Sequence, residues 1–133
     1  MIERGAADVY SATVLEHFSC PHRGPSEAEA DIVGQAGTPG EGPFMRLFLR
    51  CEGPRIVAAG FSSYGCPASQ ACGSFLSGWI EGKTFDEVAV ISADDLMRVL
   101  GGLPLGKEHT ADLAIRALQD ARRRAATVAG FHP

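Results

Sequence analysis

The stretch "YGCPASQAC" places two of the chain's four cysteines, Cys66 and Cys72, six residues apart. The residues before Cys66 read as a strand and those after it as a helix, with Pro67 at the favoured first helical position. A thiol at a helix N-terminus meets the positive end of the helix dipole. That field favours the thiolate, which is the form that binds metals or attacks electrophiles. Cys66 is therefore the first candidate functional residue.

The other cysteines carry weaker signals. Cys72 falls on the same helix face as a set of apolar residues at helical spacing. Free cysteine is also among the most often buried residue types. Six helical positions also turn it to another face and about 9 Å along the axis from Cys66, so the two are not expected to share a metal ion. Cys51 alternates with the apolar residues of "MRLFLRC" and is expected in the core. Cys20 lies in a loop before a proline.

One polar residue, His109, could join Cys66. His109 precedes a predicted helix, where it is either a flanking residue or a ligand, and Glu41 would ordinarily be a solvated carboxylate. No CxxC, HExxH or phosphate-binding loop occurs. A Cys66–His109 nucleophile would need an oxyanion donor and an orienting acid, and neither is identifiable. We therefore do not expect an enzyme.

The composition is that of a globular protein. The 133 residues are 45% hydrophobic and 21% charged, which predicts a single domain over residues 1–133. A net charge of −4 argues against binding to a nucleic-acid backbone. No apolar run has the length of a membrane span, and the N-terminus lacks the apolar core of a signal peptide. A cytoplasmic location is expected, where cysteines serve as thiols or ligands more often than as disulfides.

The apolar periodicity predicts an α+β fold, in which a three-stranded antiparallel sheet packs against helices. One face of the sheet should contact the helices that contain Trp79 and Leu118. The predicted strands cover residues 30–36, 44–52 and 55–63, and the predicted first and last helices cover 7–18 and 110–129. Gly82 should end the helix that follows Cys66. Capping residues predict two short helices, with Thr84 and Glu87 at the start of the first and Asp95 in the weaker role in the second.

Several segments together resemble one known family. "VYSATVLEHFSCP", "AGTPGEGPFMRL", "FSSYGCPASQACGS", "EGKTFDEV" and "LPLGKEHTADLAIRAL" are similar, in order and spacing, to the motifs of the IscU/NifU-type iron–sulfur cluster scaffold proteins, including the zinc-binding SufU branch. The likeness runs over about nine-tenths of the chain. It implies the IscU/NifU N-terminal fold and a site at one tip of the molecule.

The resemblance also implies which residues form that site. The family gathers three cysteines, an aspartate and a histidine. In this chain Cys66 matches the second cysteine and His109 the histidine. Glu41 stands at the first cysteine, Pro43 at the aspartate and Thr110 at the third cysteine. A threonine hydroxyl accepts no persulfide sulfur and is a poor soft ligand, so the site is expected to be degenerate.

The expected function is that of a divergent iron–sulfur cluster scaffold or carrier. Cys66, His109 and Glu41 would be its metal ligands, with Cys66 and His109 the cluster-binding pair, and would hold a cluster or a zinc ion weakly or with help from a partner. The implied partner is a cysteine desulfurase or another assembly protein. The alternative is an interaction or regulatory protein on the same fold, which docks such a partner without binding a cluster.

Overall fold

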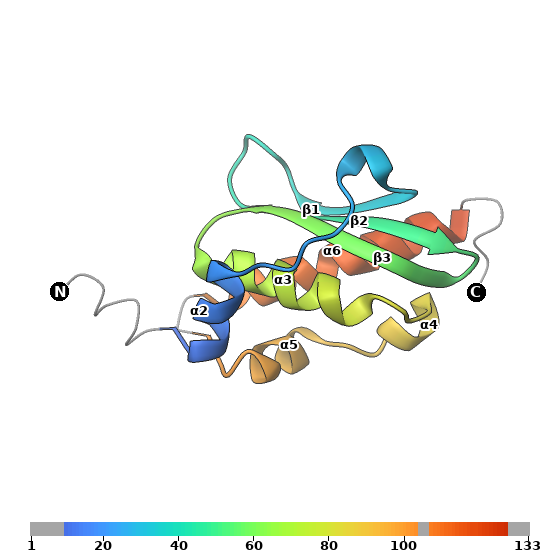
Figure 1. Ribbon diagram of the computed structural model, residues 1–133. Coiled ribbons are helices and arrows are strands. Elements are labelled where there is room, and N and C mark those ends of the chain that lie inside the picture. The colour runs from blue at the N-terminus through green and yellow to red at the C-terminus, as the bar shows by residue number, and fades with distance from the viewer. Residues whose placement is uncertain (1–9, 104–106, 128–133) are drawn as a thin grey trace.

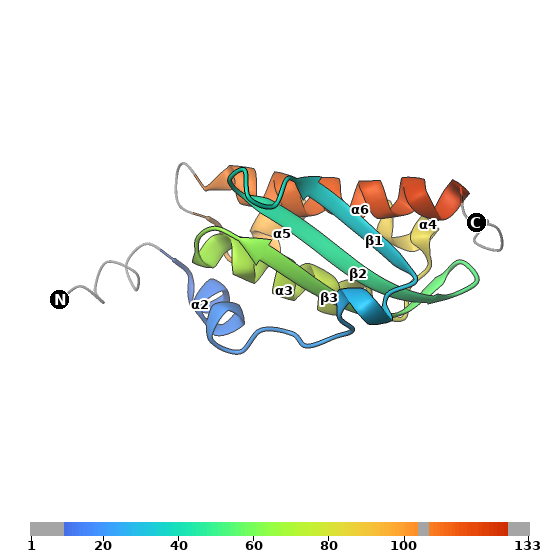
Figure 2. The same cartoon turned by 90° about the horizontal axis from the view of Figure 1, so that it is seen from above.

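A computed structural model of the chain describes residues 10–103 and 107–127. Its three strands form one antiparallel sheet in the order β1 (Ile32–Gly37), β2 (Phe44–Glu52), β3 (Arg55–Tyr64). Two long helices, α3 (Pro67–Ile80) and α6 (Glu108–Thr127), cover one face of this sheet (Figures 1 and 2). The short η1 turn (Glu27–Glu29) lies on the other face. The predicted α+β architecture is confirmed.

Of the three shorter helices, the last lies on the side of α3 and α6 that faces away from the sheet, and the other two lie toward opposite ends of the molecule (Figure 1). These are α2 (Ala12–Ser19), α4 (Phe85–Val88) and α5 (Ala93–Val99). No helix among the described residues is both long and apolar enough to cross a membrane.

The strands agree closely with those predicted. β2 has the predicted bounds, β3 extends one residue further, and β1 begins two residues later than expected. Leu49 pairs with Ile32 on one side and with Ala59 on the other, which fixes the register of all three strands. Met45, Leu47 and Leu49 point toward the helices and are fully buried. The period-2 pattern therefore identified the buried face of the sheet.

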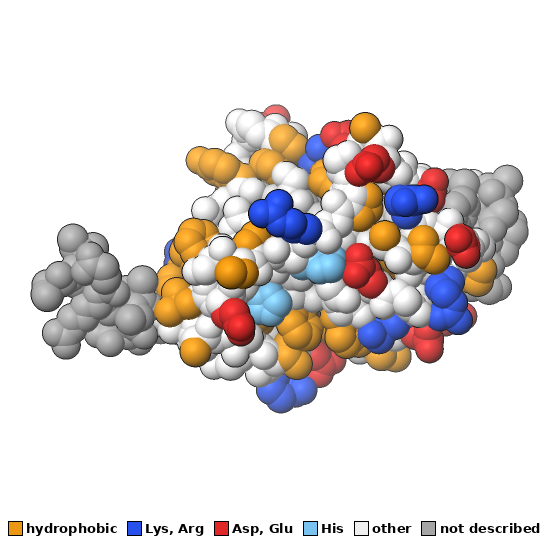
Figure 3. Space-filling model, in the orientation of Figure 1, with side chains coloured by type: hydrophobic (Ala, Val, Ile, Leu, Met, Phe, Trp, Pro, Cys, Tyr) orange, Lys and Arg blue, Asp and Glu red, His pale blue; other side chains and the backbone are white. Residues whose placement is uncertain are grey.

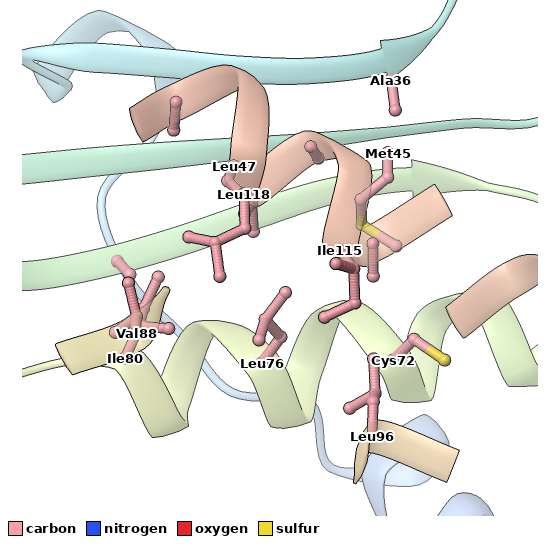
Figure 4. Close-up of a cluster of buried hydrophobic side chains, with 14 of the residues drawn as sticks. Ala36, Met45, Leu47, Cys72, Leu76, Ile80, Val88, Leu96, Ile115 and Leu118 are labelled. Carbon is pink, nitrogen blue, oxygen red and sulfur yellow. The ribbon is translucent and has the colours of Figure 1, made fainter. Parts of the chain in front are cut away.

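The core lies between the sheet and the two long helices (Figure 4). Leu76 of α3 and Leu118 of α6 pack there against Leu47 of β2. Cys72 is also fully buried in this cluster, as predicted. Burial of these side chains on one face of each element is the main stabilising term of the fold.

The helix boundaries follow the expected caps. Thr84 and Glu87 form a capping box at α4, and Ser92 and Asp95 form another at α5. Gly82 follows the end of α3 with a φ of 86°, a conformation that glycine adopts without strain. The α2 helix begins after Ser11, whose hydroxyl accepts the amide of Val14, so Tyr10 precedes the helix. The predicted helical residues 7–9 and 128–129 lie outside the described range.

Two predictions were wrong in detail. Cys51 is half-buried instead of buried, because the β2–β3 register shifts between Arg50 and Cys51 and the strand end turns out of the regular pleat. The last helix begins at Glu108, so His109 lies inside its first turn and not before it.

Candidate functional site

The β3–α3 junction presents Cys66 at one end of the molecule. Gly65 links the strand to the helix with a φ of 151°, and Cys66 is the N-cap of α3 with an extended backbone. Pro67 occupies the first turn, as predicted. A side chain at position 65 would meet Ser69 of α3 at about 3.3 Å, so the turn lies directly on the helix. The thiol thus lies on a turn that packs against the helix, and it is partly exposed.

The surroundings of Cys66 favour its thiolate. Burial raises the pKa of the thiol, but the amides of Ser69 and Ala68, the Tyr10 hydroxyl and the nearby Lys107 ammonium together outweigh it, and the pKa lies below its ordinary value. The Cys66 side chain, as a neutral thiol, makes no capping hydrogen bond to the helix. The amides therefore act mainly on the charged form, as expected at a helix N-terminus.

Tyr10 and Lys107 were not identified from the residue pattern as parts of the site. Tyr10 comes from the segment before α2, and burial together with the neighbouring Cys66 thiol raises the pKa of its hydroxyl. It therefore remains protonated at neutral pH and can donate to the thiolate. Both residues lie in segments on which the family resemblance rests. That resemblance was the only feature of the sequence from which their place in the site could have been predicted.

Thr110 is 3% exposed and sits where the family resemblance expects a cysteine. Its hydroxyl donates to the Lys107 carbonyl at 2.8 Å and lies 3.7 Å from the Cys72 sulfur. Because the Thr110 hydroxyl proton is already donated to the Lys107 carbonyl, the Cys72 thiol is the donor in the contact between Cys72 and Thr110. Burial raises the pKa of Cys72 to about 11, so this thiol is held neutral. In this structure Cys72 is a buried core residue in contact with Thr110.

The other predicted site residues are exposed. Glu41 lies in the β1–β2 loop, where its amide donates to the Thr38 carbonyl at 3.0 Å, and His109 lies on the surface of the first turn of α6. This loop, the β3–α3 junction and the start of α6 lie at the same end of the molecule (Figures 1 and 2). Cys20 is exposed at the C-cap of α2.

The described residues at this end of the molecule do not form a metal site. Among the described residues, no group of three or more His, Cys, Asp or Glu side chains is positioned to hold a metal ion. Glu41, Cys66 and His109 are therefore not assembled as a ligand set in this structure. What the tip does offer is one accessible, activated thiol beside a hydroxyl donor and a cation.

The comparisons with known proteins decide the family. The family model described as the NifU-like N terminal domain matches residues 9–125. The chain belongs to this family. It is 35% identical over 113 residues to the iron-sulfur cluster assembly scaffold protein IscU 1 of Archaeoglobus fulgidus, covering 85% of this chain and 74% of that protein. It is 32% identical over 117 residues to the iron-sulfur cluster assembly enzyme IscU of Drosophila melanogaster, covering 85% and 75%.

Solved structures confirm the fold. An iron-sulfur cluster assembly scaffold protein for the SUF system from Fervidobacterium islandicum matches with a TM-score of 0.54 at 22% identity, covering 90% of this chain and 95% of that one. A NifU-like N-terminal domain from Brucella abortus matches with a TM-score of 0.54 at 21% identity, covering 93% and 88%.

Proposed function

We propose that this protein acts in iron–sulfur cluster assembly as a scaffold or carrier with a reduced site, and that Cys66 is the residue that engages the cargo. Family membership supports the process, because the relatives are named as iron–sulfur cluster assembly scaffold proteins. The placement of Cys66 supports the residue. It is partly exposed, it lies at the tip, and its surroundings lower the pKa of its thiol.

The residues at the tip do not fit a complete cluster or zinc site. Iron–sulfur clusters and structural zinc ions are held by four soft or borderline ligands. Here Cys66 supplies one thiolate, His109 one exposed imidazole and Glu41 one hard carboxylate, and Thr110 presents a buried hydroxyl to Cys72. The cargo is therefore held together with ligands that a second protein supplies. A cysteine desulfurase or another assembly protein is the proposed partner.

One observation favours a second candidate function. Because the described residues contain no grouped metal ligands, the fold would also serve as an interaction or regulatory protein that docks an assembly partner without cargo. The two functions differ in what Cys66 does. If the protein is a carrier, replacing Cys66 should abolish cargo binding. If it is a docking protein, the same replacement should leave partner binding intact.

Metal analysis under anaerobic conditions tests the proposal. The wild-type protein, Cys66→Ser and the matched control Cys20→Ser are each incubated with iron, cysteine and a cysteine desulfurase, and bound iron and sulfide are measured. We expect substoichiometric metal on the protein alone. A desulfurase-dependent signal should be lost in Cys66→Ser and kept in Cys20→Ser. A full, oxygen-stable cluster on the isolated wild-type protein contradicts the reduced site. Equal signals in all three contradict the role of Cys66.

A restored variant separates the two candidates further. Glu41→Cys, Pro43→Asp and Thr110→Cys together add two thiolates and a carboxylate to Cys66, which is the ligand set implied by the family resemblance. We expect this variant to gain stoichiometric zinc or cluster binding. If it folds normally and binds nothing, the backbone of the tip no longer supports a site, and the docking function is favoured.

A further inference from the structure

The free edge of β3 is closed along only part of its length. β3 lies at the border of the sheet, so each backbone group that points away from β2 needs another partner. Ile56 finds one in the loop after α3, because its amide donates to the Lys83 carbonyl at 2.8 Å and its carbonyl accepts the Gly82 amide at 2.7 Å. The amide of Ala59 donates to Glu81 at 2.9 Å.

The imidazole of His22 completes this closure by bonding the Ala59 carbonyl at 3.1 Å. Both backbone groups of Ala59 therefore point away from β2. Along a strand, the backbone groups of successive residues point alternately toward and away from the neighbouring strand. No register shift interrupts the pairing from Ala59 to Tyr64, so the backbone groups of Phe61 and Ser63 also point away from β2. Within residues 10–103 and 107–127, neither Phe61 nor Ser63 has a hydrogen-bond partner on that side. This stretch of edge is open.

A cavity of about 460 Å³ lies against this open edge. Phe61, Ser62 and Ser63 line it from β3, residues 21–25 line it from the segment after α2, and Gln70 lines it from α3. We call it the edge groove. In Figure 1 the segment after α2 runs alongside β3 and α3. The surface over this region carries histidine, basic and acidic side chains (Figure 3), and the Nε2 atom of His22 lies 3.1 Å from the Glu81 carboxylate.

The outer wall of the edge groove is fixed in place. A Cβ added at Gly24 would lie 1.9 Å from the Ala59 carbonyl oxygen, and one added at Gly60 would lie 2.3 Å from the Pro25 carbonyl oxygen. Only glycines allow this approach of the two backbones. The amide of His22 also donates to the buried Ser74 hydroxyl of α3 at 2.8 Å. A preformed wall lowers the entropic cost of ordering the groove when a ligand binds.

The groove favours an anion. No carboxylate lines it, although the chain as a whole carries a net charge of −4. Arg23 lines it and makes no ion pair with the residues that the structure describes. The Ser63 hydroxyl oxygen is buried and likewise has no partner among them. The open edge thus offers amides and carbonyls in strand spacing, next to one cation.

We infer that the edge groove binds an extended peptide that carries an acidic side chain, by addition of a strand to β3. The alternation of donors and acceptors at Phe61 and Ser63 matches a peptide backbone, and a small anion would use only the donors. Arg23 supplies the partner for a carboxylate of the peptide. This inference does not depend on the cargo proposed for Cys66.

Peptide titration followed by NMR tests the inference on the whole protein. The probe is acetyl-Thr-Val-Glu-Val-Thr-amide, added to 15N-labelled protein up to about 1 mM. The matched probes are the same peptide with lysine in place of glutamate, and the glutamate peptide with alternate amides N-methylated. We expect shift changes centred on the Phe61 and Ser63 amides, with slower hydrogen exchange at both. The lysine and N-methylated peptides should bind at least about tenfold more weakly.

Charge reversal at the groove supplies the second arm. Arg23→Glu should weaken the glutamate peptide about tenfold and make the lysine peptide the tighter ligand. Arg50→Glu is the control, because Arg50 is exposed on β2 and does not line the groove. Equal shifts from sodium acetate or phosphate alone would identify a small-anion site and overturn the inference. No binding of the glutamate peptide, or shifts centred elsewhere, would overturn it as well.

Discussion

The thiols of Cys51, Cys66 and Cys72 should differ in reactivity because their pKa values differ. Burial raises the pKa of both Cys51 and Cys72 to about 11 from an ordinary value of 9.0. At pH 7 a thiol with a pKa of about 11 is ionised to about one part in ten thousand, and one at 9.0 to about one part in a hundred. Because the pKa of Cys66 is lowered, the ionised fraction of its thiol should be at least about a hundredfold larger, which should make it the more reactive thiol.

The assay is timed alkylation of the folded protein with iodoacetamide, with the modified peptides quantified by mass spectrometry across a range of pH. We expect Cys66 to react first and Cys72 last, because Cys72 is also fully buried. The midpoint of the pH profile of Cys66 should lie below that of an ordinary thiol. Tyr10→Phe removes a donor to the thiolate and should move this midpoint to higher pH.

Tyr64→Phe is the matched control for the tyrosine variant. Tyr64 is 63% exposed at the same end of the molecule and stacks on Phe44, and it is not among the groups that act on the Cys66 thiol. Its replacement should leave the profile unchanged. The reasoning is refuted if Cys72 reacts as fast as Cys66 without unfolding. It is also refuted if the midpoint of Cys66 lies at or above the ordinary value.

Two further predictions concern stability. The Asp120 carboxylate accepts a hydrogen bond from the Gln35 amide at 2.9 Å and forms ion pairs with Arg124 and Arg123. Burial raises the pKa of this carboxyl, but these partners outweigh burial and hold the pKa below its ordinary value. Asp120→Asn should cost about 1.5–3 kcal/mol at pH 7 in urea unfolding, and the difference should shrink below about pH 4, as the wild-type carboxylate becomes protonated. Leu76→Ala in the core should cost about 2–5 kcal/mol, whereas Val90→Ala, at a side chain 78% exposed, should stay within about 0.5 kcal/mol in the same assay.

Local rules explain why most of the fold could be predicted. The alternation of "FMRLFLRCE" and the capping boxes at Thr84 and Ser92 are set by residues within a few positions of one another, and both appear in the structure. The exception is Cys51, where a register shift with β3 interrupts the alternation. Such a shift depends on the pairing of two strands, so a pattern within one strand cannot reveal it.

The site was predictable only in part, for the same reason. The position of Cys66 follows from the local Gly-Cys-Pro turn. Its electrostatic partners, Tyr10 and Lys107, come from segments far away in the sequence, and their approach depends on how α2 and α6 pack. The contact between Thr110 and Cys72 likewise joins two helices. No spacing rule within one segment encodes such a contact.

The edge groove and the reactive thiol lie on one continuous element. Ser63 is three residues before Cys66, and at about 3.3 Å per residue a peptide paired at Ser63 would end within about 10 Å of the thiol. Phe61 packs against Gly73 of α3, so this part of the strand is in direct contact with the helix that carries Cys66 at its N-cap. A partner docked along the edge would therefore be held beside Cys66. For a tip that supplies a single accessible thiolate, such a position is where a second protein could provide the missing ligands.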